Sequence, residues 1–225
     1  MRSWPPNWSV DYVPVTASTN TDLLNSADRL PNRSVLATGH QTAGRGRLDR
    51  RWDAPPGTNL LVSLLFHDVP GHPGELTRRL ALAACDAVAQ VAGVVAALKW
   101  PNDILVGEAK LAGILAQRHA TGPVVVGIGL NVGWAPEGAA RLGDDVTPAE
   151  VLVALLTAYD ELPADVTQRY RQRLVTLGRA VRVHRPGDEV LDGRAVDVEP
   201  DGRLVVIDSC GVTHRFDAGD VVHVR

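Results

Sequence analysis

The chain has 225 residues, enough for one sizeable domain or for a large domain followed by a small one. Hydrophobic residues make up 45% and charged residues 22%, which is ordinary for a soluble globular protein. The net charge of −3 excludes a surface that attracts nucleic acid or anionic membranes as a whole, so any site for an anion must be local.

Apolar periodicity and turn residues predict an irregular series of strands and helices up to about residue 177. The expected helices begin at Thr19 as N-cap, cover residues 76–91, start from a capping box at Thr147, and cover residues 164–177. The expected strands are residues 12–15, 34–38, 60–66, 97–100, 110–118 and 124–130. The loop at residues 39–58 is long for a compact domain, which is typical of a functional or disordered segment.

After Gly178 the pattern changes to short β-rich runs separated by turn dipeptides such as Asp192-Gly193 and Asp201-Gly202. About 45 residues of this kind predict a small antiparallel barrel. We therefore expect an α+β protein, with a mixed sheet in a domain at residues 1–177 and a small β domain at residues 178–225.

Neither a membrane segment nor a secretion signal is visible. No apolar run is long enough to cross a bilayer, and no apolar region follows the first residues. Cys85 and Cys210 lie far apart, which favours free thiols in a reducing compartment. We expect a cytoplasmic protein with no membrane partner.

The strongest candidate for an anion site is Gly44-Arg45-Gly46-Arg47-Leu48-Asp49-Arg50-Arg51-Trp52. Glycines let the backbone approach an anion, and the planar guanidinium groups bind carboxylates and phosphates in bidentate fashion. Trp52 offers a ring for stacking on a base. The same run is also compatible with a solvated basic loop, or with contact to a nucleic acid backbone.

A second motif combines Lys99-Trp100-Pro101-Asn102-Asp103 with Lys110-Leu111-Ala112-Gly113. Lys99 and Lys110 are the two lysines of the chain, among 23 basic residues. Pro101-Asn102-Asp103 is a strong turn sequence, so both lysines are expected near one end of a sheet. Ammonium, amide and carboxylate groups there suit phosphate and Mg²⁺. A surface hairpin with an Asp–Lys ion pair is the alternative.

Two weaker signals complete the set. Gly127-Ile128-Gly129-Leu130-Asn131-Val132 places glycines in an apolar strand, which indicates close approach by backbone or ligand. Asn131 is suited to the amino edge of adenine, or to capping a turn. Ser18, Thr19, Asn20 and Gln41 suit an uncharged, urea-like ligand, although Ser18 and Thr19 are also good helix caps.

Together these motifs, in this order from Ser18 to Val132, resemble the biotin–protein ligase family. The resemblance covers more than half of the chain, and the β-rich tail is similar to the small SH3-like C-terminal domain of that family. It implies a catalytic domain of the biotin/lipoate ligase type, similar to class II aminoacyl-tRNA synthetases. The implied reaction joins biotin to AMP at the expense of ATP, with Mg²⁺, and transfers biotin to a lysine of a biotin carboxyl carrier domain of an acyl-CoA carboxylase.

The resemblance also implies roles for individual residues. Catalysis is assigned to Lys110, Arg45, Arg47 and Asp103, with Asp103 also holding Mg²⁺. Biotin binding is assigned to Ser18, Thr19, Asn20, Gln41, Gly44, Arg45, Gly46, Arg47, Lys110 and Gly113. ATP binding is assigned to Arg50, Trp52, Lys99, Asn102 and Asn131.

Some features depart from the family pattern. Leu48-Asp49 stands where the family often has a further arginine or glycine pair, and residues 133–145 lack an expected Thr-Ser segment. No winged helix-turn-helix precedes Val10, so the form without DNA binding is expected, as a monomer or weak dimer. Two alternatives are a lipoate–protein ligase and a non-enzymatic nucleic-acid binder; the charge of −3 and the carboxylates Asp49 and Asp53 weigh against the second.

Overall fold

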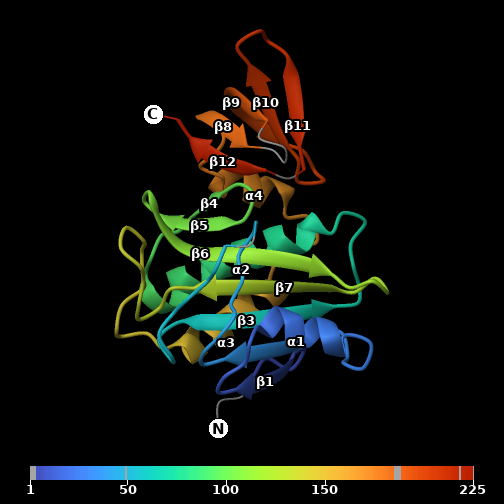
Figure 1. Cartoon of the computed structure of the whole chain (residues 1–225), viewed down its shortest axis with the longest axis vertical. Helices are drawn as coiled ribbons and strands as arrows, with labels where there is room; N and C mark the ends of the chain where they lie inside the picture. Colours follow the sequence, from blue (N-terminus) through green and yellow to red (C-terminus); the bar gives the residue numbers. More distant parts are fainter. Residues whose placement is uncertain (1–3, 49, 185–188, 218, 225) are drawn as a thin grey trace.

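The fold consists of two β-sheets that lie one above the other in Figure 1, with helices on the larger one. A computed structural model describes residues 4–48, 50–184, 189–217 and 219–224. Seven strands form the larger sheet in the order β1-β2-β3-β7-β6-β5-β4, and five form the smaller in the order β11-β10-β9-β8-β12. This confirms the predicted α+β class.

The larger sheet is mixed because β1 and β2 pair in parallel, whereas its other neighbours pair antiparallel. Its strands are β1 (Ser9–Val13), β2 (Ser34–Thr38), β3 (Leu60–Phe66), β4 (Ala97–Lys99), β5 (Asp103–Val106), β6 (Ala109–Arg118) and β7 (Val124–Leu130). Every residue of the interior strand β3 is buried, which requires cover on both faces of the sheet.

Two helices cover the back face of the larger sheet, and one short helix covers part of the front face. Helices α2 (Gly74–Ala92) and α3 (Pro148–Asp160) pack together behind the sheet in Figure 1, while α1 (Thr19–Ser26) lies in front. Alternate residues of β3 point to opposite faces, so Leu64 joins the main core and Leu65 joins a small cluster with Leu23 of α1. Because α1 is short, part of the front face stays free for a site.

The smaller sheet is antiparallel throughout, as predicted. It consists of β8 (Ala180–His184), β9 (Val190–Val198), β10 (Leu204–Asp208), β11 (Thr213–Phe216) and β12 (Asp220–His223). Helix α4 (Thr167–Arg173) precedes it, so the predicted division between residues 177 and 178 falls between the last helix and the first strand of this sheet.

Three sequence-based boundaries were wrong, and one strand was missed. The strand expected at residues 12–15 is Ser9–Val13, and the helix expected at residues 164–177 is Thr167–Arg173. Helix α1 has Ser18, not Thr19, at its N-cap, without a capping bond from the side chain. Strand β5 was missed because it has four residues, too few for a periodic signal. The capping box at Thr147 and the remaining strands were predicted correctly.

Both cysteines are free thiols, one buried and one exposed. Burial raises the pKa of the Cys85 thiol to about 12, which makes this thiol a poor nucleophile. None of the helices in the described parts of the chain combines the length and the apolar character that crossing a bilayer demands.

Candidate functional site

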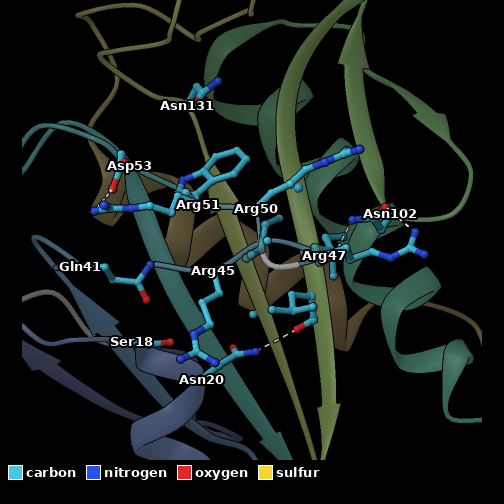
Figure 2. A pocket seen from close by; sticks show the side chains of 18 of the residues that line it. Ser18, Asn20, Gln41, Arg45, Arg47, Arg50, Arg51, Asp53, Asn102 and Asn131 are labelled. Carbon is cyan, nitrogen blue, oxygen red and sulfur yellow. Dashed lines mark hydrogen bonds and ion pairs between the residues drawn. The ribbon is translucent and has the colours of Figure 1, made fainter. Parts of the chain in front are cut away.

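A cavity of about 400 Å³ opens on the front face of the larger sheet. Its walls come from the start of α1, from strands β3, β5, β6 and β7, and from residues 44–52, here called the arginine loop. Figure 2 shows the labelled side chains of the loop reaching over these strands. Most residues predicted from the sequence line this cavity: Ser18, Thr19, Asn20, Gln41, Arg45, Gly46, Arg47, Arg50, Trp52, Asn102, Asp103, Lys110, Gly113 and Asn131.

Glycines form the floor of the cavity. Gly113 of β6 pairs directly with Gly129 of β7, and one step along the sheet Gly127 pairs with Ser63 of β3. A Cβ atom at Gly129 would collide with the indole of Trp52, and one at Gly127 would collide with the Asn20 carboxamide. The glycines are therefore required because neighbouring side chains lie directly on the backbone.

One end of the cavity is polar and uncharged. The Ser63 hydroxyl lies 2.6 Å from Thr19 Oγ1 and donates to Asn20 Oδ1 at 2.6 Å. Gln41 Oε1 lies 3.1 Å from Thr19 Oγ1 and also accepts from the Thr19 backbone N–H. Three oxygen–oxygen contacts thus share the hydrogens of two hydroxyl groups. This end has an excess of acceptors, which favours a ligand that brings N–H donors.

The orientation of Asn20 is fixed from outside the cavity. Its Nδ2 donates to Leu115 O at 3.1 Å and to Gln117 Oε1 at 2.8 Å, so both of its N–H groups are used. The carboxamide oxygen therefore points toward Ser63 and the cavity. Ser18 holds the N-cap position without a capping bond from its side chain, and the Thr19 hydroxyl contacts Gln41 and Ser63, so the capping interpretation was wrong for Thr19.

The opposite end of the cavity is charged. Lys110 Nζ lies 2.6 Å from Asp103 Oδ1, so the ion pair of the alternative interpretation exists, but it lines the cavity instead of a plain surface hairpin. A register shift between β5 and β6 pairs Leu105 with Lys110 and Asp103 with Gly113. Without this shift Lys110 and Gly113, three residues apart, would face opposite sides of the sheet.

The arginine loop folds back on itself above the sheet. Gly46 N donates to Arg50 O and Trp52 N donates to Gly44 O, which closes a hairpin over the cavity. Leu48, at the tip, has a φ of 53°, a left-handed conformation that is costly for a non-glycine residue. Asp49, the other departure from the family pattern, lies outside the described residues.

The arginines of this loop are not equivalent. Arg47 donates to Asn102 Oδ1 at 3.2 Å and to Gly219 O of the smaller sheet at 3.1 Å. Arg51 forms an exposed ion pair with Asp53. Figure 2 shows Arg45 extending toward Ser18 and Asn20, and within the described part of the chain its guanidinium has no hydrogen-bond or ion-pair partner. Arg45 is thus the cation most available to an anionic ligand.

Trp52 rests inside the cavity. Its indole contacts Gly129 and lies next to Gly113, and Lys110 Nζ is 5.7 Å from the ring centroid. The indole Nε1 is buried without a hydrogen-bond partner among the described residues. A buried donor without a partner is costly, so a ligand acceptor at this position would be favoured.

Three residues that the sequence predicted to bind ligand are either outside the cavity lining or bonded to other parts of the protein. Gly44 does not line the cavity but packs against the backbone of Trp52. Lys99 also lies outside the lining, on the side of the smaller sheet, where burial and then the charges of Lys99 and Arg179 lower the pKa of His223. Asn131 lines the cavity, but its Nδ2 donates to Ala140 O and its Oδ1 accepts from Asn59.

Sequence reasoning missed three residues that build the site. Ser63 is fully buried in β3, and a single serine in an apolar strand was the available signal. Asn59 is 2% exposed and its Oδ1 accepts from the backbone N–H groups of Val132 and Trp134. Gln117 orients Asn20 and could not be found without knowing that β6 lies beside α1.

The chain matches two family models. Residues 12–133, more than half of the chain, match the biotin/lipoate A/B protein ligase family, and residues 176–224 match the biotin protein ligase C terminal domain. The chain belongs to the biotin/lipoate A/B protein ligase family. The first match contains the whole polar end, the arginine loop and the Lys110–Asp103 pair.

Individual relatives agree with this membership. A biotin–[acetyl-CoA-carboxylase] ligase of Mycobacterium tuberculosis is 39% identical over 96% of this chain and 89% of the relative. One of the same name from Paracoccus denitrificans is 33% identical over 87% and 89%, respectively. A solved biotin protein ligase from Aquifex aeolicus, in complex with biotin and ATP, shares the fold, with a TM-score of 0.81 at 23% identity over 96% and 99%.

A substitution at Asn59 tests whether its side chain stabilises the segment after β7 that contributes to the wall of the cavity. Replacing it by alanine removes the acceptor of two backbone N–H groups, so Asn59→Ala should lower the free energy of unfolding by about 2–3 kcal/mol. Chemical denaturation measures this. Asn7→Ala removes an exposed amide that donates to Asp160 and should cost less than about 0.5 kcal/mol. Equal losses for the two variants would contradict the role of Asn59.

Proposed function

We propose that this chain activates biotin with ATP to form biotinyl-5′-AMP and transfers the biotin to a specific lysine of a biotin carboxyl carrier protein. The observation that carries the proposal is the polarity of the cavity: an uncharged acceptor-rich end, a glycine floor and a cationic end in one continuous space. Biotin has the matching order of groups, with a ureido ring, an apolar thioether ring and a carboxylate on a flexible chain.

The uncharged end suits the ureido group. Ser18, Thr19, Asn20, Ser63 and Gln41 supply hydroxyl and carboxamide groups, and the excess of acceptors there matches the two N–H donors of a urea. A site built to bond donors rejects analogues that lack them, because its buried acceptors are then left unpaired. These residues are therefore our candidates for selecting the ring of the substrate.

The cationic end suits the reacting groups. Biotin carboxylate and the α-phosphate are both anions, and bringing them together costs Coulomb energy that cations offset. Lys110, paired with Asp103, is placed for this, and Arg47, which donates to Asn102, lies at the same end. Arg45 lines the same cavity with its guanidinium directed toward Ser18 and Asn20, so it would have to turn to meet the reacting groups. The chain thus contributes positioning and charge stabilisation, with no covalent step on a side chain.

The proposed reaction has two steps. A carboxylate oxygen of biotin attacks the α-phosphorus of ATP, the bond to the bridging oxygen breaks, and pyrophosphate leaves with that oxygen. In the second step the uncharged ε-amine of a carrier lysine attacks the acyl carbon, the bond to the AMP oxygen breaks, and the amide loses one proton. The arginine loop, folded over the cavity, keeps water away from the hydrolysable anhydride.

The residues present fit Mg²⁺ brought by ATP. Within the described residues no cluster of three or more His, Cys, Asp or Glu side chains forms a protein cage for a metal. Mg²⁺ usually binds through one or two carboxylates together with substrate phosphates, and Asp103 is the carboxylate in this cavity next to a lysine. When bound, the ion neutralises phosphate charge, while Asp103 would hold it and Asn102 lies beside it in the same turn.

We assign the nucleotide to the part of the cavity between Trp52, Asn102 and Asn131. Trp52 supplies a ring for adenine and an unpartnered donor. Asn131 acts here through the backbone that it holds, because its carboxamide is bonded to Asn59 and Ala140. Lys99 lies outside the lining, so we do not extend the ATP site to it.

The match to the biotin protein ligase C terminal domain supports biotin over lipoate as the substrate. The carrier proposed is the biotin carboxyl carrier domain of an acyl-CoA carboxylase, because the two relatives above carry acetyl-CoA-carboxylase in their names. A cytoplasmic location, a monomer or weak dimer, and the absence of DNA binding remain predictions from the sequence.

The first half-reaction has a direct measurement. Purified protein should exchange ³²P-pyrophosphate into ATP when biotin is added, and should not when lipoate replaces it. Exchange with lipoate alone would contradict the biotin assignment, and exchange with neither acid would contradict the proposed activity as a whole.

Lys110 should be needed for this half-reaction. Lys110→Ala removes the cation at the cavity end that holds the reacting anions, and should slow adenylate formation by about 10²–10³-fold. Rapid-quench assay of biotinyl-AMP measures the rate. Arg118→Ala is the matched control, because it removes an exposed cation from the same strand, and should change the rate less than about twofold. A near-normal rate for Lys110→Ala would refute the assignment.

A further inference from the structure

Three backbone carbonyls of the β9–β10 turn and the residue before β12 accept hydrogen bonds from side chains of the larger domain, and one of these donors, Arg47, lines the cavity. Gly202 O, in the turn of residues 199–203 between β9 and β10, accepts from Trp100 Nε1 at 2.9 Å. Pro200 O in the same turn accepts from Arg78 Nη2 of α2 at 2.7 Å. Gly219 O, just before β12, accepts from Arg47 Nη2 of the arginine loop at 3.1 Å.

Trp100 occupies the middle of this junction. It is 3% exposed, its indole N–H bonds the smaller sheet, and its backbone N–H bonds Thr176 Oγ1 at 3.0 Å. Both of its N–H groups are therefore fixed by parts of the chain that follow residue 173. Such double anchoring leaves the backbone that follows Trp100 little freedom to shift.

The backbone after Trp100 leads directly into the site. Asn102, two residues on, accepts from Arg47 and bonds Ile114 of β6 twice, through its own carbonyl and through its side chain. Asp103, the next residue, forms the ion pair with Lys110. A displacement at Trp100 is thus carried to the charged end of the cavity within three residues.

The uncharged end has no such connection. Ser63, Thr19, Asn20 and Gln41 bond one another, and Asn20 also bonds β6. Their partners come from α1, β3, β6 and Gln41, which precedes the arginine loop, and among the described residues none of these bonds involves the smaller sheet. The two ends of the cavity should therefore respond differently when the junction is loosened.

We propose that Trp100 is a positioning residue, through which the docked 199–203 turn of the smaller sheet sets the place of Asn102 and Asp103 and thereby the affinity for ATP. This deepens the proposed function and rests on it. The smaller sheet acts on the nucleotide end of the cavity while leaving the uncharged end alone, because the path runs through the turn after β4. The link to Arg47 at Gly219 adds a second restraint on the same end.

Trp100→Phe tests the proposal because phenylalanine keeps an aromatic ring but cannot donate to Gly202, and the volume that it loses is matched in the control variant. Trp8→Phe is the matched control: Trp8 is 6% exposed, its Nε1 donates to Asp160 Oδ2 at 3.1 Å, and it lies away from the smaller sheet. Both variants thus lose one indole hydrogen bond from a buried side chain.

Three quantities should be measured for each variant: the KM for ATP in biotin-dependent pyrophosphate exchange, the Kd for biotin by calorimetry, and the hydrogen-exchange rate of the Ile114 amide. That amide bonds the Asn102 carbonyl and therefore reports on the turn. For Trp100→Phe we expect the KM for ATP to rise about five- to tenfold, the Kd for biotin to stay within about twofold, and faster exchange at Ile114. Trp8→Phe should leave all three unchanged.

The proposal is overturned if Trp100→Phe changes the KM for ATP no more than Trp8→Phe does, or if the affinities for ATP and biotin fall together. Arg78→Met provides a second variant that leaves Trp100 intact, removes the donor to Pro200, and should raise the KM for ATP in the same direction. If the wild-type protein shows no exchange reaction at all, the proposed function fails. The Ile114 amide then decides the link alone, since equal exchange in the two tryptophan variants would overturn it.

Discussion

Strands β6 and β7 pair side by side in the larger sheet, and both carry glycine where they face each other on the cavity side. Gly113 faces Gly129, and Gly127 lies one step away, so a patch of bare backbone is exposed on the front face. Only such a patch allows Trp52 and Asn20 to lie at van der Waals distance from the strands. The positions of Trp52 and of the arginine loop that carries it depend on this contact, and Lys110 Nζ likewise lies close to Gly113.

The sequence predicted those parts of the molecule that depend on local pattern. Apolar runs identified β2, β3 and β7, and the Thr147 capping box identified α3, since residues three or four apart decide such elements. The arginine loop and the turn at Asn102 were recognisable because their residue types have special backbone or charge properties. The arginine loop, the turn at Asn102, β3 and β7 together contain half of the residues that line the cavity.

What remained hidden depends on partners that are distant in sequence. The register shift that turns Lys110 to the same face as Gly113 is a property of two paired strands, and no feature of β6 alone announces it. Ser63 and Gln117 become part of the site because α1 is placed against β3 and β6. The junction with the smaller sheet is hidden for another reason: its acceptors are backbone carbonyls, which every residue type provides.

The scarcity of lysine has a consequence for the chemistry that the cavity contains. An enzyme that holds an acyl-adenylate exposes it first to its own nucleophiles, and an amine of the enzyme that attacked the acyl carbon would end in self-acylation. Guanidinium groups remain protonated and do not attack acyl carbons, so a mouth built of arginines binds the anion without consuming the intermediate. Of the two lysines, Lys99 lies outside the cavity lining and Lys110 is held by the Asp103 carboxylate. The reactive mixed anhydride can therefore wait for an amine that arrives from another protein.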